Sequence, residues 1–546
     1  RTSVEGVFAV GDATNQGASI AIEAIGEARR CAKVVDLYLH GVQVPYQKTY
    51  LSVKNVSPEY FADYIKLPRA KMPTRPAEER KHDFQEINLG FSEAQARAEA
   101  ARCLDCGCHD FAECKLIRCA NLYELQPERI QRLKGDGEGK VHPSYKEKRL
   151  VAIERDQGKC ILCGQCSLVC PTGALVEKDD TEKVLDALQD PKKHVIVQVA
   201  PSVRVSLGDA FGMEPGAIVT GQMVTALHLL GFDKVFDTNF GADLTIMEEG
   251  TEFLDRLQHG GVLPMMTSCC PGWVYYVEKH YSDCLPHLSS TKSPMSIFGA
   301  VAKTYYPKVA GIDVKDIVTV SVMPCTAKKF EAARPELGRD GRPDVDIVLT
   351  TRELIKLIKY VGLSFGQLPE TEFDSPLGTA SGAGAIFGTT GGVMEAALRT
   401  VCDKLTGKTL ERLDFQEARG FKGIKECTLE LGGRTLHIAI AHTLKNAEIL
   451  MEQVRKGISP YDFIEVMACP GGCIGGGGQP IGTTNAVKKK RMQALYEIDR
   501  SLPVRKSHEN PVLQVLYRDF LGEPGEGKAH ELLHTGYRAV PKTYQF

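Results

Sequence analysis

Cysteines are the residues of this sequence whose number and spacing point most directly to chemistry. The 546-residue chain contains 18 of them. In a large chain with no export signal, so many thiols are typical of metal binding or redox chemistry rather than of a disulfide scaffold. Most fall into three groups, at residues 103–119, 160–170 and 269–473. The isolated ones are expected to be small buried apolar residues, and they are Cys31, Cys284, Cys402 and Cys427.

The second group has the most specific spacing. It follows the pattern C-x2-C-x2-C-x3-C with a proline directly after it, and its members are Cys160, Cys163, Cys166 and Cys170. Such short spacers allow three thiolates to bind one 4Fe–4S cluster, while the fourth binds the same cluster or a neighbouring one. Structural zinc is the alternative, although zinc sites more often show two separated ligand pairs. We predict an iron–sulfur cluster here.

The first group is less regular and contains five thiols. A second 4Fe–4S cluster is the preferred interpretation, with zinc and plain core cysteines as alternatives. Because one cubane takes four ligands, we expect the fifth thiol, Cys119, to be spare or to serve the neighbouring cluster. Ser92 and Gln95 are expected to form a capping box that opens the helix leading into this group. The four expected ligands are Cys103, Cys106, Cys108 and Cys114.

The third group follows short apolar segments that are typical of buried strands. Four such segments are expected, at residues 195–200, 263–267, 317–323 and 463–467. The first is followed by Pro-Ser and the other three by cysteines. Parallel strands of an α/β domain present their carboxyl ends to one crevice, where ligands bind. No single loop offers a complete ligand set, so we expect the loops to converge.

Glu249 and Glu252 form a pair of carboxylates on an expected helix that ends at Gly260-Gly261. A spacing of three places both on one helix face. Most such pairs are solvated surface residues. Their position about 20 residues before Cys269-Cys270 would place them beside the crevice.

Composition narrows the classes of function. Hydrophobic residues make up 43% and charged residues 25%, with a net charge of -2, so there is no basic footprint for nucleic acid. No apolar stretch approaches the length of a membrane span. The three glycines Gly382, Gly384 and Gly388 do not form the dinucleotide fingerprint, and no Walker loop occurs. The first residues contain no Met and no signal segment, so we expect a cytoplasmic chain that begins within a longer protein.

Three ordered motifs give the third group a family resemblance. Residues 267–273 (TSCCPGW), 323–331 (MPCTAKKFE) and 467–473 (MACPGGC) closely resemble the three signatures of FeFe hydrogenases. The resemblance covers roughly residues 155–546 and includes residues 240–249 (FGADLTIMEE) and 382–388 (GAGAIFG). It ends in a region similar to a fused hydrogenase small subunit, with residues 505–510 (RKSHEN) and 529–534 (AHELLH).

The resemblance implies an H-cluster, which is a 4Fe–4S cubane joined through a cysteine thiolate to a diiron unit with CO, cyanide and a bridging dithiolate. Cys473 would be the bridging thiolate, and Cys269 would be the thiol beside the diiron unit. Lys328 would donate to a cyanide and Met323 would pack by the diiron unit. The implied cubane ligands are Cys270, Cys325, Cys469 and Cys473. The implied lining of the diiron unit is Ala200, Pro201, Ser202 and Phe387.

The resemblance also implies a proton relay. It would run through Cys269, Glu249, Ser289, Glu252 and a surface-side Glu331. A buried thiol can stay protonated and hand over one proton. Buried carboxylates with a raised pKa can carry that proton onward near neutral pH. A buried ammonium suits an anionic ligand, which is the role implied for Lys328.

The N-terminal part resembles a different family. Residues 7–12 (VFAVGD) and the helix expected at 20–39 look like the last flavin-contacting segment of glutamate-synthase small-subunit flavoproteins, in which Asp12 would meet FAD. Residues 102–108 (RCLDCGC) resemble iron–sulfur segments found with such flavoproteins. The glycine-rich dinucleotide folds that precede such a segment in that family do not occur in this sequence. FAD is therefore not expected on this fragment alone.

Together these observations predict a multidomain α/β protein, with an H-cluster domain of two α/β lobes and a ferredoxin-like iron–sulfur domain in front. The expected domains are a flavoprotein remnant (1–43), a connector with the cysteine-rich segment (44–150), a ferredoxin-like 4Fe–4S domain (151–188), the H-cluster domain (189–485) and a small-subunit-like region (486–546).

The expected function is the reversible interconversion of protons and electrons with H2, with about two further 4Fe–4S clusters relaying electrons. The expected partners are a redox partner such as ferredoxin or a flavin-containing NAD(P)H-linked subunit of a larger complex, for which electron bifurcation is one option, and maturation enzymes for the diiron unit. The alternatives are a sensory hydrogenase-like protein with low turnover and a cluster-carrying assembly protein. The complete relay and the intact 323–331 motif argue against them.

Overall fold

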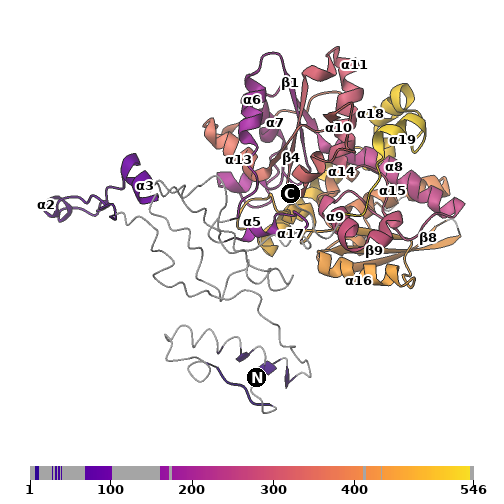
Figure 1. The fold of residues 1–546 in the computed structure, drawn as a ribbon, viewed down its shortest axis with the longest axis horizontal. Helices are drawn as coiled ribbons and strands as arrows, with labels where there is room; N and C mark the ends of the chain where they lie inside the picture. Colours follow the sequence, from indigo (N-terminus) through magenta and orange to yellow (C-terminus); the bar gives the residue numbers. More distant parts are fainter. Residues whose placement is uncertain are drawn as a thin grey trace, which may run out of the picture. The chain divides into compact units, whose positions relative to one another are not determined.

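A computed structural model of the chain describes residues 6–10, several positions between 28 and 39, and residues 68–100, 160–170, 175–409, 413–431 and 433–540. The chain divides into two compact units, Arg1–Lys54 and Asn55–Phe546. Figure 1 draws the described parts as ribbons. In the first unit, the described positions from 28 to 39 are helical, as expected. The apolar run at residues 6–10 predicts a strand, but no described strand includes it. The Phe8 ring lies edge-on to Tyr38, with ring centroids 5.5 Å apart.

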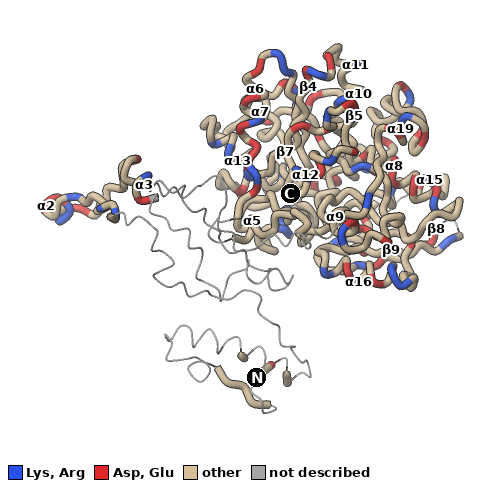
Figure 2. The backbone as a smooth tube through the Cα atoms, in the orientation of Figure 1, with Lys and Arg blue, Asp and Glu red and all other residues tan. Residues whose placement is uncertain are grey.

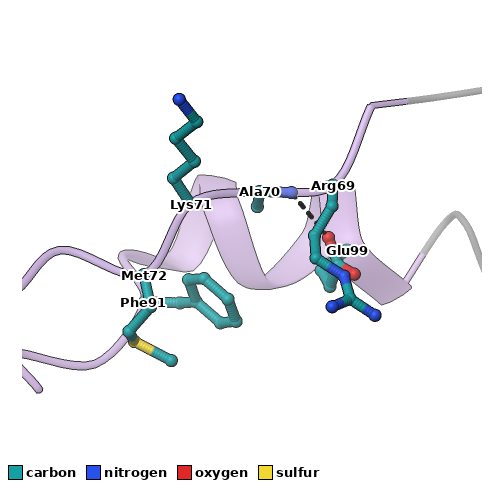
Figure 3. A pocket seen from close by; sticks show the side chains of 6 residues that line it. All are labelled: Arg69, Ala70, Lys71, Met72, Phe91 and Glu99. Carbon is teal, nitrogen blue, oxygen red and sulfur yellow. Dashed lines mark hydrogen bonds between the residues drawn. The ribbon is translucent and has the colours of Figure 1, made fainter.

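Residues 68–100 contain two short helices, α2 (Ala77–Arg80) and α3 (Glu93–Ala100). The predicted capping box is confirmed, since the Gln95 amide donates to Ser92 Oγ at 3.3 Å and the Ser92 amide donates to Gln95 Oε1 at 3.0 Å. The Ala70 amide donates to Glu99 at 2.8 Å, and both residues line a pocket together with Arg69, Lys71, Met72 and Phe91 (Figure 3). The cysteine group that was expected to follow α3 lies outside the described residues.

The first of two large sheets has four parallel strands in the order β2 (Lys234–Asp237), β1 (His194–Val199), β4 (Ile317–Met323) and β7 (Ile347–Thr350). Successive side chains of a strand point to opposite faces. Val195 and Val197 therefore pack into a core with α7 (Thr220–Leu230) and α13 (Thr351–Tyr360). Ile196 packs into another core with α10 (Pro294–Thr304).

The second sheet has the order β3 (Met265–Met266), β10 (Phe463–Met467), β9 (Arg434–His442) and β8 (Ile424–Leu431), with β8 as an antiparallel edge strand. Ile438 and Ile440 pack toward α15 (Gly392–Thr406). Ala439 and Ala441 pack toward α9 (Pro271–His280) and α16 (Leu444–Arg455). Both sheets are covered on both faces, which confirms the predicted pair of α/β lobes.

Helix α8 (Thr238–His259) lies between the two lobes and contacts α10, α14 (Gly382–Ile386) and α15. Phe240 and Leu244 belong to a core shared with the first sheet, whereas Ile246 and Phe253 belong to a core shared with the second. Apolar residues therefore occur on more than one side of the helix, which buries its carboxylates as well. The helix ends at Gly260, as predicted, in the left-handed conformation.

The C-terminal region packs onto this centre through α17 (Asn485–Ser501) on α14, α18 (Pro511–Leu516) on α8, and α19 (Gly527–Leu533) on α10. A π-helical turn, Tyr517–Leu521, follows α18. The remaining described elements are α5 (Gln165–Val169), α6 (Thr181–Gln189), α11 (Tyr306–Ala310), α12 (Ala327–Ala332), β5 (Gly338–Arg339) and β6 (Arg342–Pro343), together with short 3₁₀ turns.

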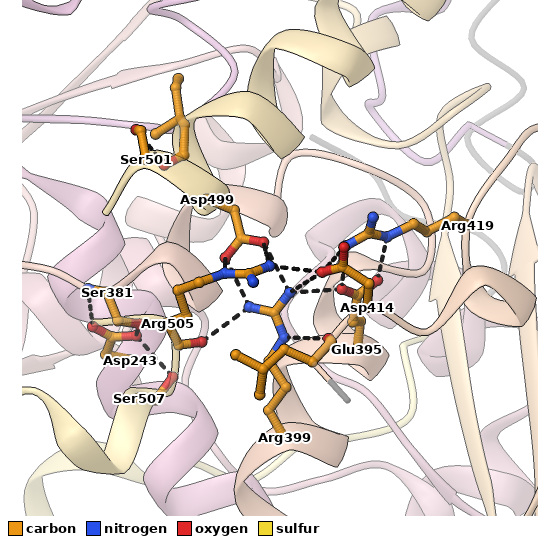
Figure 4. Close-up of polar contacts among 12 residues, drawn as sticks. Asp243, Ser381, Glu395, Arg399, Asp414, Arg419, Asp499, Ser501, Arg505 and Ser507 are labelled. Atoms are coloured by element: carbon orange, nitrogen blue, oxygen red, sulfur yellow. Dashed lines mark hydrogen bonds and ion pairs between the residues drawn. The ribbon is translucent and has the colours of Figure 1, made fainter. Parts of the chain in front are cut away.

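Buried ion pairs attach the C-terminal region to the lobes (Figure 4). Arg399 of α15 donates to Asp499 of α17 at 2.8 Å and to Glu395 at 2.7 Å, and all three side chains are 0% exposed. Arg419 and Arg505 complete the network. Glu395, Asp414 and Asp499 lie close enough together to hold a metal ion, but the three guanidinium groups already neutralise them. They therefore serve as a structural ion-pair network.

Charged residues of both signs are mixed along the described chain (Figure 2). Among the described helices, none combines the length and the apolar composition that a membrane crossing requires.

Candidate active site

Cysteines gather where strands of both sheets end. Cys270 precedes α9 and follows β3, and Cys325 lies between β4 and α12. Cys469 and Cys473 follow β10. Burial and the neighbouring sulfurs of Cys270 and Cys325 raise the pKa of Cys473. The same influences raise the pKa of Cys469. Direct contacts join the loops, since the Ala468 amide lies 3.4 Å from Cys270 Sγ and the Gly478 amide donates to the Pro324 carbonyl at 2.8 Å. The predicted convergence of the loops is therefore confirmed for these four thiols.

Glycines allow the two cysteine-bearing loops to meet. A Cβ on Gly476 would lie 2.2 Å from the carbonyl oxygen of Pro324, beside Cys325. Gly472 has φ +91° and its Cβ would lie 2.7 Å from the Thr390 amide nitrogen. Only glycine satisfies both conditions. The loop after β10 is thereby held directly against the loop after β4.

The four thiols fit a cubane cluster as a donor set. Burial raises the pKa of Cys270, while amides of its surroundings favour the thiolate, including the Ala468 amide 3.4 Å from its sulfur. Burial and the Cys270 sulfur raise the pKa of Cys325 to about 12, opposed by the amides at the start of α12. Cys469 is buried and the other three are half-buried. Four thiolates gathered at one place need bound cations for stability, and a 4Fe–4S cluster takes four such ligands. Zinc accepts the same set.

Cys269 has a different environment from its neighbour. It is 8% exposed and belongs to the core cluster that contains Phe387 and Met467. Burial raises the pKa of its thiol well above the ordinary value, and the negative charge of Glu249 raises it further. The Cys269 side chain therefore stays protonated near neutral pH.

Lys328 and Glu331 form a buried pair in α12. Lys328 Nζ donates to Glu331 Oε2 at 2.7 Å, to Ser293 Oγ at 2.7 Å and to the Cys269 carbonyl at 3.2 Å. Burial alone would lower the pKa of Lys328, but the Glu331 carboxylate outweighs that effect and raises it, so the side chain stays charged. The three ammonium hydrogens all have protein acceptors. Donation to another ligand would require one of them to be exchanged.

The expected surface-side position of Glu331 is wrong. Glu331 is 5% exposed and also accepts from the Ser296 hydroxyl at 2.5 Å. The physical reason is the i,i+3 spacing to Lys328, which lets the two charges pair on one helix face while α12 packs against its neighbours. Glu331 therefore acts as the ion-pair partner of Lys328 and not as the outer end of the relay.

Glu249 is a buried carboxylate of α8 that follows Glu248 directly. It is 0% exposed, and within the described chain neither oxygen has a hydrogen-bond partner. Burial and the charge of Glu252 raise its pKa to about 8, although the nearby Ser268 amide and Ser289 hydroxyl favour the charged form. A carboxyl group with such a pKa gains and loses a proton close to neutral pH.

Glu252 lies one helical turn further along α8 and is well bonded. It accepts from Ser289 Oγ at 2.8 Å, from the Ser290 amide at 3.0 Å and from Arg256 Nη2 at 2.6 Å. Arg256 also donates to the carbonyls of residues 262, 286 and 288. Sequence reasoning missed Arg256. The signal was present, because Glu252 and Arg256 have the i,i+4 spacing of a helical ion pair.

The other expected lining residues are buried at the same strand ends. Met323 is the last residue of β4 and is 2% exposed, and Phe387 follows α14 and is 5% exposed. Ala200, Pro201 and Ser202 form the buried turn after β1. The Ser202 hydroxyl has no hydrogen-bond partner among the described residues. A buried hydroxyl without a partner fits a polar group that the protein itself does not supply.

The Cys160–Cys170 segment lies directly on the cysteine loops. Thr326 Oγ1 donates to the Leu162 carbonyl at 2.7 Å, and Gln165 Nε2 donates to the Gly475 carbonyl at 2.8 Å. Burial raises the pKa of Cys163, as do the sulfurs of Cys166, Cys160 and Cys325. A cluster held by this segment would adjoin the thiols of the crevice.

Comparisons with known proteins identify the family. Residues 193–477 match the iron-only hydrogenase large subunit, C-terminal domain. The chain belongs to the iron-only hydrogenase family. Residues 485–540 match the iron hydrogenase small subunit, and residues 153–176 match the 4Fe–4S binding domain.

Individual relatives agree with this assignment. The chain is 54% identical over 385 residues to the NADP-reducing hydrogenase subunit HndD of Solidesulfovibrio fructosivorans, an alignment that covers 69% of this chain and 66% of HndD. It is 46% identical over 442 residues to iron hydrogenase 1 of Clostridium pasteurianum, covering 72% of this chain and 77% of that protein. A solved structure of the FeFe-hydrogenase HydA1 from Chlamydomonas reinhardtii matches with 45% identity and a TM-score of 0.60, covering 66% of this chain and 99% of that one.

The family assignment decides between iron and zinc in the crevice. The chain is a hydrogenase-type oxidoreductase, and its large-subunit domain implies an H-cluster together with 4Fe–4S binding. The roles of individual residues are proposals that rest on the geometry above.

Proposed function

We propose that this chain interconverts protons and electrons with H2 by moving protons through its own side chains, from Glu252, which Arg256 holds at the outer end, through Ser289 and Glu249 to Cys269. The observation that carries this proposal is Glu249. It is a fully buried carboxylate without a hydrogen-bond partner among the described residues, and it lies between a protonated thiol and a hydrogen-bonded carboxylate. A structural role would require partners for such a group.

The two carboxylates have different tasks in this path. Glu252 is held by an arginine, a hydroxyl and an amide, which fix its position. Glu249 shares the Ser289 hydroxyl as a neighbour and has a pKa of about 8. A proton that reaches Glu252 can therefore pass through the hydroxyl to Glu249 and from there to Cys269. In the reverse direction, Glu249 receives the proton from Cys269.

The chain's thiols and polar groups would hold the H-cluster. Cys270, Cys325, Cys469 and Cys473 would bind the cubane, Cys473 as the bridge, and the diiron unit would supply the site at which H2 forms or is split. Lys328 would hold an anionic ligand there after exchange of one of its present acceptors. The unpartnered Ser202 hydroxyl would be a second donor, and Met323 and Phe387 would exclude water.

Electrons would enter through the Cys160–Cys170 segment, because its loop touches the loops of Cys325 and Cys473. Cys103, Cys106, Cys108 and Cys114 would hold a further cluster. HndD is named an NADP-reducing hydrogenase subunit, which supports a flavin-containing NAD(P)H-linked partner over ferredoxin alone. Electron bifurcation would be a property of the whole complex.

The proposal is tested by comparing two preparations of the full chain. One is expressed with the maturation enzymes for the diiron unit and the other without them. We expect H2 evolution from a reduced dye, together with infrared bands of CO and cyanide, only from the first. Three cubanes and a diiron unit give about 14 iron atoms per chain. Equal activity from both preparations would refute the proposal.

A further inference from the structure

The C-terminal region contributes a buried histidine to the segment that holds Glu252. His534 follows α19 directly and is 9% exposed. One of its ring nitrogens, Nδ1, lies 2.8 Å from Ser290 Oγ. The backbone is joined at the same place, because the Thr535 amide donates to the Ser290 carbonyl at 2.7 Å and Thr291 pairs with His534 in a β-bridge. Ser290 is thus fixed to the C-terminal region by its hydroxyl and its carbonyl.

Glu248 anchors the histidine from the other side. His534 Nε2 lies 2.9 Å from Glu248 Oε2, and Glu248 is 0% exposed. The same carboxylate accepts from the Tyr517 hydroxyl and from the Gly525 amide at 2.7 Å. A carboxylate only accepts, so His534 Nε2 carries a hydrogen, and in the neutral ring Nδ1 accepts from Ser290. The imidazole is held in one orientation by a residue at each end.

Ser290 connects this anchor to the proton path. The Ser290 amide donates to Glu252 Oε2 at 3.0 Å and to Glu252 Oε1 at 3.2 Å. The hydroxyl of the adjoining Ser289 donates to Glu252 Oε2 at 2.8 Å. The position of both donors follows from the backbone at Ser289-Ser290. That backbone is bonded to His534. Glu248 holds His534 in place and lies on the same helix as Glu249 and Glu252. His534, a residue of the small-subunit-like region, thereby links Glu248 to the segment that holds Glu252.

We propose that His534 is a positioning residue for proton transfer, which acts through Ser290 to hold the Ser289 hydroxyl between Glu252 and Glu249. The proposal rests on the proposed function of the path. It gives the C-terminal region a task in turnover besides covering the lobes. Proton transfer depends steeply on the geometry of the hydrogen bonds along the path. Loss of the Ser290 contact should therefore slow turnover without altering the clusters.

Two variants of the full, matured chain separate this task from general packing. In His534→Asn the side-chain oxygen replaces Nδ1 and can accept from Ser290, but the contact to Glu248 is lost. In His534→Gln the amide nitrogen replaces Nε2 and can donate to Glu248, but the contact to Ser290 is lost. His530→Gln is the matched control, because His530 is an exposed neighbour whose ring stacks on His534 with centroids 4.6 Å apart.

The readouts are kcat and KM for a reduced dye, the solvent isotope effect on kcat, and the infrared bands of CO and cyanide. We expect His534→Gln to lower kcat by about ten- to a hundredfold, with an increased isotope effect and unchanged KM and bands. His534→Asn should lose less than His534→Gln, and His530→Gln should match the parent. An equal or larger loss in His534→Asn would overturn the proposal, as would unchanged kcat in His534→Gln.

A further variant decides the matter if neither His534 substitution folds. Ser290→Ala removes only the hydroxyl that meets His534, and it should reproduce the lower kcat and the increased isotope effect. Unchanged turnover in Ser290→Ala would overturn the proposal. A parent chain that lacks both H2 evolution and the infrared bands would instead refute the proposed function, so the two failures are distinguishable.

Discussion

Two sets of buried acidic side chains in this molecule differ in their partners. The network around Arg399 surrounds Glu395 and Asp499 with guanidinium groups (Figure 4). Glu249 is equally buried but has no partner among the described residues. Burial alone would raise the pKa of Asp499, but hydrogen bonds from Arg399 and Arg505 outweigh it and leave the pKa below its ordinary value. At Glu249 burial and the charge of Glu252 raise the pKa to about 8.

The difference shows how one protein uses the same residue types for structure and for chemistry. A carboxylate that is fully paired keeps its charge and joins elements together. A carboxylate that is left unpaired titrates near neutral pH and can pass a proton. Each set should therefore respond differently to substitution. The unpaired set should change turnover at constant stability, and the paired set should change stability at constant turnover.

The largest effect on turnover is expected for Cys269→Ser. Cys269 is not assigned as a cluster ligand, and a hydroxyl is a much weaker acid than a thiol, so loss of this proton donor should lower H2 evolution by about 10²–10⁴-fold. Iron content and the infrared bands of CO and cyanide should remain. Activity and iron are measured on the same matured sample. Loss of the cubane instead would mean that the roles of Cys269 and Cys270 are exchanged.

The largest effect on stability is expected for Arg399→Met. Breaking a buried charge pair leaves Glu395 and Asp499 with fewer partners, and such changes lower the free energy of unfolding by about 3–5 kcal/mol. Denaturant unfolding of parent and variant measures the difference. Turnover per folded molecule should be unchanged. A variant that is as stable as the parent would contradict the distinction between the two sets, and lower turnover at that unchanged stability would reverse it.

The paired set should also weaken in acid. Because the pKa of Asp499 is lowered in the folded chain, its contribution to stability is present above the unfolded pKa of about 3.8 and is lost as pH falls below that value. Asp499→Asn should therefore flatten this part of the stability curve, measured by denaturant unfolding between pH 5 and pH 3. An unchanged slope in the variant would show that other groups cause the acid loss.

The smallest effect is expected for Arg256→Gln. Arg256 donates to Glu252 and is 14% exposed in its side chain, so it stands at the outer end of the path. Its removal leaves Ser289 and the Ser290 amide in place, and we expect H2 evolution to fall by about tenfold. Arg434→Gln, at an exposed arginine that bonds to the Leu257 carbonyl, is the control. Equal activities in the two variants would exclude Arg256 from the path.

Much of the frame was predictable from the sequence because it depends on local patterns. The strands at 317–323 and 463–467 were predicted to the residue, since both are short, mostly apolar runs that Pro-Cys and Ala-Cys follow directly. Convergence of their loops followed from the rule that parallel strands end at one edge. The end of α8 followed from Gly260.

The finer placement of charges was not predictable in the same way. Glu331 was expected at the surface and is buried, because its pairing with Lys328 depends on how α12 packs. Glu249 and Glu252 share one helix face, but Glu252 gains Arg256 by its i,i+4 spacing and Ser289 and Ser290 by tertiary contacts, whereas Glu249 has no hydrogen-bond partner among the described residues. Ser290 and His534 are 244 positions apart, so no sequence spacing could bring them together. The N-terminal cysteines lie outside the described residues, and their cluster stays a prediction.

The most direct test of the contrast between paired and unpaired charge is the protonation state of Glu249. A carboxyl group whose pKa is raised to about 8 is protonated and neutral below that pH and charged above it. Infrared difference spectra of the matured chain, titrated from pH 5 to pH 10, should show one carboxyl C=O band that disappears with a midpoint near pH 8 and is absent from Glu249→Gln. A Glu249 band that disappears near pH 4–5, the range of an ordinary glutamate, would contradict the account.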